Sequence, residues 1–358
     1  GGVETFLKNF LENYNNKDKI FLFINKSNRT NYNIKKNYKN IKLIEYDIFN
    51  IEDKIANRNN LVIIFLKIYL SFFFPILSFH QILKIKEIFL HTKINKLMVI
   101  NGGFPGSSLC LSASIAWNFL YPNKKSWHNV HAFPVKPNNI IRNIFYKIYF
   151  YNLFYKSIYG FISVSKGCSK SLKEFSQGNK LKYHTIYNGT KLKKFKKINL
   201  KKKLMIKNNS KLLVMLATYN LYKGYKFIFK VMEHLIEKKN NVYLVVFGDK
   251  YNNQFNIVKK LRNYSKARQN IFLKGYNKNK NGILRSSDFV VIPSQIDESF
   301  GYVALEAIIN GKIPISTNVG GIPEIILNNF NGYVVNRNKP EVFANKILLL
   351  IKDKKKCE

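Results

Sequence analysis

Two glutamates lie where an expected strand gives way to an expected helix. Glu298 falls in a short polar loop after the apolar run that ends at Ile292, and Glu306 falls about two turns into a helix that opens near Gly301. A carboxylate accepts two hydrogen bonds from a vicinal diol, as in a sugar or a ribose. The free N–H groups that begin the helix would attract an anion. Taken alone, however, the pair is better explained as a helix cap and a solvated side chain.

The elements that would position these residues are an alternation of strands and helices. Apolar β-rich runs are expected to form strands at 20–25, 41–47, 97–101, 126–131, 158–165, 183–187, 211–217, 242–247, 270–274, 288–292, 312–316 and 332–335. Amphipathic stretches such as 224–239 and 302–309 lie between them. This order predicts an α/β fold with parallel sheets, and the nearly continuous apolar runs indicate sheets covered by helices on both faces.

A domain boundary follows the turn signal Asn188-Gly189. The lysine-dense stretch 191–207 comes next, and we interpret it as a basic, solvated linker and not as a nucleic-acid patch. The predicted organisation is a Rossmann-like domain over 1–190, the linker over 191–207, and a second Rossmann-like domain over 208–358. Ligands of doubly wound sheets bind at the carboxyl ends of the strands, so the cleft between the two domains is the expected site.

The residues around the two glutamates resemble those of a known family. Glu298 to Glu306, with Phe-Gly inside, is similar to the Glu-x7-Glu signature of family 4 glycosyltransferases, which are retaining enzymes of the GT-B fold. The resemblance continues in 311–317, 319–325, 331–333, Lys223-Gly224, Gly248-Asp249, 288–294, Asn188-Gly189 and the opening 1–4. It spans essentially the whole chain and is densest in the second half.

The resemblance implies a donor site in the second domain. Glu306 would hold the ribose hydroxyls of a nucleoside-diphosphate sugar. Glu298, together with backbone N–H groups around Phe300, Gly301 and Tyr302, would hold the transferred sugar and the phosphates.

Lys223 would neutralise the diphosphate as it leaves, because preorganised cations and amides stabilise charge that develops there. No metal and no other cofactor is expected, since this lysine and the helix N-terminus supply the positive potential. Gly2 would belong to the first loop of the family and would contribute to the donor site. In the family a strand precedes that loop, and we expect this first strand to be missing before Gly1.

One position departs from the family pattern. An arginine is usual five residues before the lysine, and this chain has Thr218 there. A hydroxyl does not replace the guanidinium fork on a phosphate. Either another cation reaches the site, with Arg262 and Arg285 as the candidates, or donor binding relies more on Lys223.

Histidines near the end of the expected strand 126–131 could act on the transferred sugar. Members of the family often carry His-Asn at this place, which implies that His128 is a catalytic residue. His131 is a rival, and a lone histidine is more often structural. The nearby turn 101–106 could cradle an acceptor phosphate, but a tight turn before a helix explains it equally well.

Composition limits the remaining classes. Lys and Arg number 60 and Asp and Glu 20, a net charge of +40, for which AT-rich coding is the main explanation. Such a surface still attracts nucleotides, nucleic acid and anionic lipid. An apolar content of 46% with 15% aromatics excludes a disordered basic tail. Three scattered cysteines (Cys110, Cys168 and Cys357) exclude a disulfide scaffold and favour a reducing compartment.

Two segments suggest contact with a membrane surface. Residues 61–79 resemble a span, but Lys67 and Pro75 interrupt them, so a buried or interfacial helix is expected. Residues 139–159 alternate basic and aromatic side chains, as in an interfacial helix or in a domain-packing helix with snorkelling lysines. Together with the charge, they favour a cytoplasmic protein, peripheral on the anionic inner face of the membrane.

The resulting hypothesis is a retaining, metal-independent glycosyltransferase. It would move a sugar from a nucleoside diphosphate to a glycan or lipid-linked acceptor at the cytoplasmic membrane face, in the synthesis of cell-surface polysaccharide or glycolipid, with no specific nucleic-acid partner. One alternative is a catalytically impaired GT-B protein that binds membranes or nucleic acid through its basic surface. Another is a glycogen- or sucrose-type glycosyltransferase with a soluble acceptor.

Overall fold

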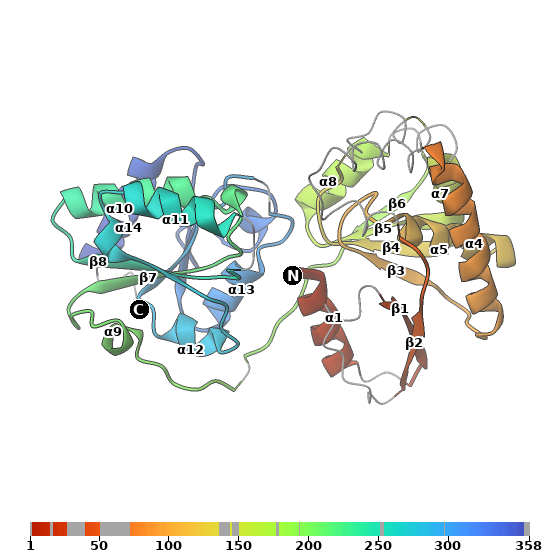
Figure 1. Cartoon of the computed structure of the whole chain (residues 1–358), viewed down its shortest axis with the longest axis horizontal. Coiled ribbons are helices and arrows are strands. Elements are labelled where there is room, and N and C mark those ends of the chain that lie inside the picture. Colours follow the sequence, from red (N-terminus) through yellow and green to blue (C-terminus); the bar gives the residue numbers. More distant parts are fainter. Residues whose placement is uncertain are drawn as a thin grey trace. The chain divides into compact units, whose positions relative to one another are not determined.

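The chain folds into two compact units, Gly1–Gly189 and Thr190–Glu358. The computed structural model in Figure 1 describes residues 2–14, 17–26, 40–50, 72–135, 144, 150–176, 179–192, 194–250, 254–296 and 298–353. Both units are α/β, and the paired strands within them are parallel. Each strand expected from the sequence is present, with small differences at the ends. The α/β prediction with parallel sheets is therefore confirmed.

Unit 2 contains a six-stranded sheet with the order β12-β11-β10-β7-β8-β9. Its strands are β7 (Lys211–Leu216), β8 (Val242–Phe247), β9 (Ile271–Lys274), β10 (Phe289–Ile292), β11 (Ile313–Thr317) and β12 (Tyr333–Val335). Its helices are α9 (Leu200–Lys203), η3 (Leu221–Lys223), α10 (Tyr225–Glu237), α11 (Phe255–Tyr264), η4 (Arg268–Asn270), α12 (Lys280–Arg285), α13 (Tyr302–Ile309), η5 (Ile322–Glu324) and α14 (Pro340–Lys352).

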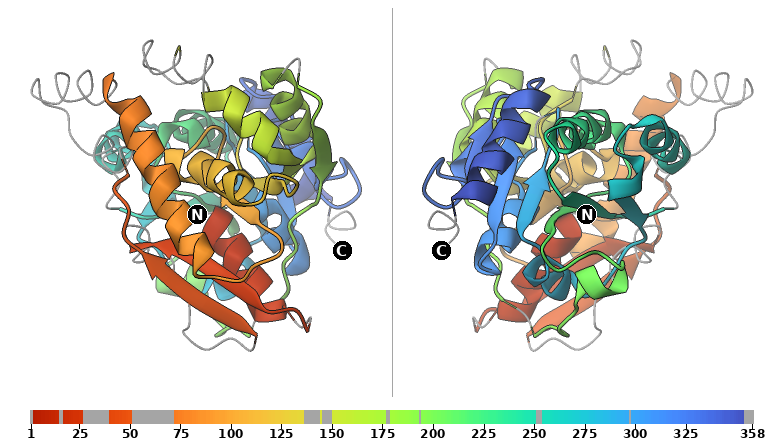
Figure 2. Two further views of the ribbon diagram at one scale, coloured as in Figure 1. Left: turned by 90° about the vertical axis from the view of Figure 1, so that its right-hand side faces the viewer. Right: turned by 90° about the vertical axis from the view of Figure 1, so that its left-hand side faces the viewer.

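The apolar runs of unit 2 are explained by burial on both faces of the sheet. Leu213 and Met215 of β7 pack with α10, α11 and α14, and the intervening residues Leu212 and Val214 pack with α9 and α12. Helices α10 and α14 lie side by side on the first of these faces (Figure 2). Because neither face of β7 meets water, apolar side chains occupy consecutive positions of the strand.

Unit 1 contains two separate parallel sheets among its described residues. One pairs β1 (Ile20–Asn25) with β2 (Ile41–Tyr46), and the other has the order β3 (Met98–Asn101), β4 (Ser126–Val130), β5 (Ile158–Ser163), β6 (Lys182–Thr185). Its helices are α1 (Gly2–Asn13), α4 (Phe74–Leu90), α5 (Ser108–Leu120), α7 (Tyr151–Ser157) and α8 (Lys166–Phe175). The core brings α4, α5, α7 and α8 together against β4 and β5.

The lysine-rich stretch after the boundary is more structured than a solvated linker. Leu200 of α9 and the nearby Ile206 are both buried in the core of unit 2. Lys201 lies 3.1 Å from the carboxylate of Asp288. Two apolar residues among many lysines anchor this stretch, and the charge pattern alone concealed them.

The two segments expected at a membrane are only partly described. Residues 61–71, 139–143 and 145–149 lie outside the described part of the chain. Of the second segment, α7 buries Tyr151, Phe154 and Tyr155, so that portion is a packing helix. Within the described residues, no helix combines the length and the apolar character that a membrane span requires.

Candidate functional site

The candidate site lies at the point where the strand order of unit 2 reverses. Strand β7 has β10 on one side and β8 on the other. The loops that leave β7 and β10 therefore diverge at the carboxyl edge of the sheet, where doubly wound folds bind ligands. Lys223 ends the short helix η3 in the loop after β7, and Glu298 lies in the loop after β10.

The structure brings these two side chains together. The Nζ atom of Lys223 lies 2.5 Å from Oε1 of Glu298, and the two side chains are only 19% and 21% exposed. The hydroxyl of Ser294 donates to the same carboxylate oxygen at 2.6 Å. The Lys223 ammonium also lies over the ring of Tyr222, 5.0 Å from its centroid. A half-buried ammonium group and a hydrogen-bonded carboxylate are thus in contact at the carboxyl edge of the sheet.

The backbone of Glu298 is held by a neighbouring glycine pair. The Gly321 amide donates to the Glu298 carbonyl at 2.7 Å. Gly320 adopts φ +54°, and a Cβ atom added there would collide with the same carbonyl oxygen. A side chain at Gly320 would therefore push the Glu298 loop out of place.

Replacing Gly320 by alanine is expected to destabilise this loop and to weaken nucleoside-diphosphate binding. The left-handed backbone costs an alanine about 1–2 kcal/mol, and the clash with the Glu298 carbonyl adds to that cost. Gly311 is the matched control, because it has φ +67° and a Cβ atom added there would meet nothing within 4 Å. Thermal unfolding and calorimetric titration with nucleoside diphosphates compare the two variants. Equal losses in G320A and G311A would show that the contact with the Glu298 carbonyl has no effect.

The start of α13 faces the same loop. Gly301 precedes the helix with φ +99°, a conformation that favours glycine. The first N–H groups of the helix have no acceptor within it, so they are available to an anion. The rings of Phe300 and Tyr302 meet edge-to-face at 5.2 Å beside this end.

Two buried polar atoms on α13 lack a hydrogen-bond partner among the residues that the structure describes: the Tyr302 hydroxyl and Oε2 of Glu306. Residues four positions apart in a helix lie on the same face. The other oxygen of Glu306, Oε1, is 3.6 Å from the ammonium of Lys280, and the Glu306 side chain is 14% exposed. Burial and the Glu306 carboxylate raise the pKa of Tyr302. Leaving such atoms unsatisfied costs free energy, so this face suits a ligand with hydroxyl groups.

Neither Arg262 nor Arg285 takes the place of the arginine that the family pattern has at the position of Thr218. Thr218 follows β7 and its hydroxyl accepts from the Asn220 amide at 3.1 Å. Arg262 donates to the Ile271 carbonyl at the beginning of β9. Arg285 donates to Asn310, which caps the far end of α13 from Gly301. Both guanidinium groups therefore lie toward the amino edge of the sheet, and the expectation for them was wrong.

Sequence reasoning also missed residues that complete the site. Ser294 and Gly320 were part of the matching segments, but their contacts with Glu298 were not foreseen. Lys280 was not identified, because its sequence separation from Glu306 carries no signal. Only the folded sheet brings the start of α12 to the middle of α13.

In unit 1 the structure corrects the assignments of two residues. Gly2 is the first residue of α1, so it begins a helix and is not part of a loop. His128 is completely buried within β4, where its Nε2 atom lies 3.2 Å from the Cys110 carbonyl. Its ring contacts that of Phe154 at 4.8 Å. A histidine enclosed in this way cannot contact a bound sugar, so the catalytic role expected for His128 does not fit the structure.

His131 is the histidine at the end of the strand. It directly follows β4, its amide donates to the Asn101 carbonyl at 3.0 Å, and its ring lies 4.5 Å from that of Phe6. The Asn101 side chain in turn donates to Pro105 and accepts from Gly103, which supports the tight-turn interpretation of 101–106.

Acid is expected to destabilise unit 1 through these two histidines. Burial lowers the pKa of His128 to about 3 and that of His131 to about 4. The unfolded chain then binds more protons below its histidine pKa of about 6.5, so stability falls as the pH drops from that value. Between pH 7 and pH 5 each histidine should cost about 2 kcal/mol.

Urea unfolding of wild type and H128F, followed by near-UV circular dichroism from pH 7.5 to pH 5, measures this effect. Phenylalanine fills the apolar surroundings and does not titrate, so the variant should lose about half of the pH dependence. Identical pH profiles for the two proteins would contradict the assignment of a neutral, buried His128.

Comparison with known proteins places this site in a family domain. The family model described as "Glycosyl transferases group 1" matches residues 196–358. Residues 196–358 form a glycosyltransferase group 1 domain. Lys223, Glu298 and Glu306 all lie within this group 1 domain.

Two curated relatives extend the similarity. The chain is 28% identical over 195 residues to the uncharacterized glycosyltransferase MJ1607 of Methanocaldococcus jannaschii, covering 51% of this chain and 48% of that protein. It is also 28% identical over 189 residues to the UDP-Gal:alpha-D-GlcNAc-diphosphoundecaprenol alpha-1,3-galactosyltransferase of Escherichia coli, covering 49% of this chain and 46% of that protein. The chain thus spans about half the length of these relatives.

Solved structures support the fold of both units. Anabaena HepE in complex with UDP matches with a TM-score of 0.70 and 16% identity, over 100% of this chain and 88% of that chain. At this identity the likeness concerns the fold alone, which is the α/β fold with parallel sheets of GT-B glycosyltransferase structures.

Proposed function

We propose that this protein is a retaining glycosyltransferase whose group 1 domain binds a nucleoside-diphosphate sugar. The observation that carries the proposal is the contact of Lys223 with Glu298 at the carboxyl edge of the sheet, beside the start of α13. The cation and the helix N–H groups can bind the phosphates of such a donor and the negative charge that develops on them in the transition state. The carboxylate can accept hydrogen bonds from the sugar hydroxyls.

The reaction assigns a role to each group. The bond between the anomeric carbon and the diphosphate oxygen breaks, and negative charge builds on the leaving diphosphate. Lys223 and the N–H groups at the start of α13 stabilise that charge. Glu298 is held by Ser294 and orients the sugar. Glu306 accepts hydrogen bonds from the ribose hydroxyls, and the Tyr302 hydroxyl donates to a ribose oxygen. The acceptor hydroxyl oxygen forms the new bond to the anomeric carbon on the same face of the sugar, and its proton passes to the leaving diphosphate oxygen. No step requires a metal ion.

A screen of uridine-, guanosine- and adenosine-diphosphate sugars tests this function. We propose that the nucleotide is UDP, because the E. coli relative is named for UDP-Gal, and we therefore expect a uridine-diphosphate sugar to be transferred or slowly hydrolysed. Retention at the anomeric carbon is detected by NMR, and EDTA should cause no loss of rate. If no nucleoside diphosphate binds in calorimetric titrations, while RNA or liposomes bind tightly and in a salt-sensitive way, the protein is a basic binding module and not an enzyme.

We further propose that the acceptor is lipid-linked and that unit 1 contacts the membrane through α4. The name of the E. coli relative specifies a diphosphoundecaprenol acceptor. Helix α4 leaves Ile76, Phe79 and Leu83 exposed at 65%, 56% and 46%. These residues recur at helical spacing, so they form one apolar stripe. A chain with a net charge of +40 adds electrostatic attraction to an anionic surface.

Charges placed on this stripe are expected to abolish sedimentation with anionic liposomes. The double variant I76D/F79D puts two carboxylates where apolar side chains would enter the headgroup region. L349D is the control, because Leu349 is 61% exposed on α14 in unit 2. Co-sedimentation with phosphatidylglycerol vesicles should fall at least tenfold in I76D/F79D and little in L349D. Equal binding by all three proteins would contradict docking through α4 and favour a soluble acceptor.

A further inference from the structure

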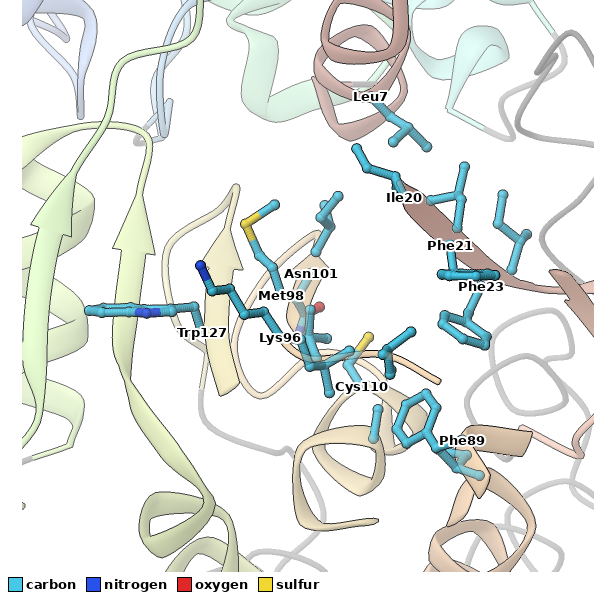
Figure 3. A pocket seen from close by; sticks show the side chains of 18 of the residues that line it. Leu7, Ile20, Phe21, Phe23, Phe89, Lys96, Met98, Asn101, Cys110 and Trp127 are labelled. Carbon is cyan, nitrogen blue, oxygen red and sulfur yellow. The ribbon is translucent and has the colours of Figure 1, made fainter. Parts of the chain in front are cut away.

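Two cavities in the described part of the chain differ in their chemistry. The larger, of about 1150 Å³, lies within unit 1, and Figure 3 shows apolar side chains such as Leu7, Phe23 and Phe89 around it. The smaller, of about 350 Å³, lies within unit 2. Its nine lining residues include no acid and four cations, which are Lys250, Lys259, Arg262 and Lys274. The charge of this basic cavity suits an anionic ligand.

The basic cavity lies along the outer edge of the unit 2 sheet. Strand β9 is the last strand in the sheet order, and all of its residues line the cavity together with residues of α11. Strand β8 separates β9 from β7, whereas Lys223 and Glu298 meet in the loops after β7 and β10. The basic cavity and the candidate donor site share no residue. They are therefore two different sites.

The four cations are spread along the edge strand. Lys250 follows β8 and Lys274 ends β9, so both lie at the carboxyl end of the cavity. Arg262 donates to the carbonyl of Ile271, the first residue of β9. Lys259 precedes Arg262 by about one turn of α11 and lies between the two ends. A strand of this length covers about 10 Å, so the positive charges form a row of similar length.

The lysines at the carboxyl end are held in place but are not neutralised. The Lys250 ammonium lies 5.6 Å from the centroid of the Phe255 ring, and the Lys274 ammonium lies 5.8 Å from that of Phe272. An aromatic face attracts an ammonium group and leaves its charge in place. No acid within the described residues forms an ion pair with any of the four cations. An anion in the basic cavity would be their partner.

The guanidinium of Arg262 is also fixed beside the cavity. Its Nε atom donates to the Ile271 carbonyl at 3.1 Å, and its Nη1 atom donates to the Asn263 side chain at 3.2 Å. The remaining N–H groups of the guanidinium have no acceptor among the described residues. A planar group held in this way matches the oxygen atoms of a phosphate.

The edge of β9 is a poor place for an acidic peptide to add as a strand. In a parallel ladder, successive residues direct their N–H and C=O groups to opposite sides. The Lys274 carbonyl accepts from the Gly248 amide, on the β8 side, so Ile271 and Leu273 face outward. Arg262 already occupies the Ile271 carbonyl, which interrupts the row of groups that an added strand would need. The basic cavity therefore favours an anion that binds through its charge.

We propose that the basic cavity binds a ligand with two or more phosphate groups in a row. Each phosphate carries negative charge and several acceptor oxygens, which suit ammonium and guanidinium groups. A row of cations of about 10 Å is longer than one phosphate group, which favours a di- or triphosphate chain. These phosphates belong either to a free compound or to the headgroup of a lipid, and in both sources the chemistry is the same. The proposal is independent of the proposed function, since it uses no residue of the donor site.

Acetylation of lysines, measured by mass spectrometry on the wild-type protein, tests whether the basic cavity is occupied. Tripolyphosphate at about ten times its Kd should slow the acetylation of Lys250, Lys259 and Lys274 about tenfold, because the bound fraction is protected. Lys226 and Lys230 are the controls, because they are exposed on α10 and do not line the cavity. Equal protection of the cavity lysines and the controls would overturn the proposal.

Two further additions identify the source of the phosphates. Vesicles that contain diacylglycerol pyrophosphate replace tripolyphosphate in one experiment, and hexaglutamate replaces it in the other. Protection of the cavity lysines by tripolyphosphate indicates a free compound, and protection by the vesicles alone indicates a lipid headgroup. Both results support the proposal. Protection by hexaglutamate alone, or by none of the three additions, would overturn it.

Calorimetric titration with tripolyphosphate, or with the vesicles where they alone protect, assigns the binding to the basic cavity. All proteins carry K223M, which removes the cation of the donor site. K259Q/K274Q should weaken binding at least about tenfold, since two charged contacts are lost, and K226Q/K230Q should have little effect although it removes the same charge. Equal losses in the two double variants would show attraction by net charge alone and would overturn the proposal. Binding by K223M, together with no binding of nucleoside diphosphates by the wild type, would contradict the proposed function and support this site.

Discussion

Replacing Glu298 by glutamine is expected to lower the rate of sugar transfer about 100- to 1000-fold, the effect of removing one preorganised polar group from a transition state. Glutamine keeps the size of the side chain and can still accept the Ser294 hydroxyl. It removes the negative charge that Lys223 contacts and that orients the sugar. Steady-state transfer with the donor identified by the screen measures the loss, and far-UV circular dichroism checks the fold.

The affinity for UDP separates a role in catalysis from a role in folding. Because E298Q releases Lys223 from its ion pair, UDP binding should not weaken, although transfer does. E341Q is the matched control, since Glu341 is a 71% exposed acid on α14 and should change neither quantity. Transfer by E298Q at the wild-type rate would refute the assigned role. A loss of transfer together with a loss of both UDP binding and secondary structure would indicate a structural residue instead.

The strands and the donor-site helix were predictable because both depend on local sequence. Burial on two faces forces consecutive apolar residues into β7, and the turn chemistry of Gly301 fixes the start of α13. Local sequence does not show that Lys223 and Glu298 meet, because their contact depends on the order of the strands in the sheet. Their assignment to one site came from the family resemblance. The sequence pattern thus located the site within the chain, and the sheet determined which side chains meet.

The predictions for His128, Arg262 and Arg285 failed for one physical reason. Each depended on how deeply a side chain is buried or on which edge of the sheet it points to. His128 and His131 lie close in sequence, but their surroundings differ. Helices that pack on β4 bury His128 in the core, whereas His131 lies just after the end of the strand. Arg262 and Arg285 were chosen by residue type, whereas their helices direct them to the amino edge. Depth and direction follow from packing between distant segments, which local patterns do not encode.

Replacing Glu306 by alanine is expected to weaken UDP binding about 10- to 100-fold, since a hydrogen bond to a charged group contributes about 1.5–3 kcal/mol. Its buried Oε2 atom has no hydrogen-bond partner within the described part of the chain, so a ribose hydroxyl would satisfy it. Isothermal titration with UDP and with 2′-deoxy-UDP shows whether that hydroxyl is the one bound. The wild type should prefer UDP, and E306A should bind both ligands alike.

Two neighbouring variants show which oxygen of Glu306 matters. K280M removes the ammonium near Oε1 and should have a small effect on the preference for UDP, because Oε2 remains in place. Y302F removes the buried hydroxyl on the same face of α13 and should reduce the preference in part. If E306A binds UDP as tightly as the wild type, or keeps its full preference over 2′-deoxy-UDP, the carboxylate does not bind the ribose. The unpartnered oxygen would then require another ligand group, and the donor would have to lie differently along α13.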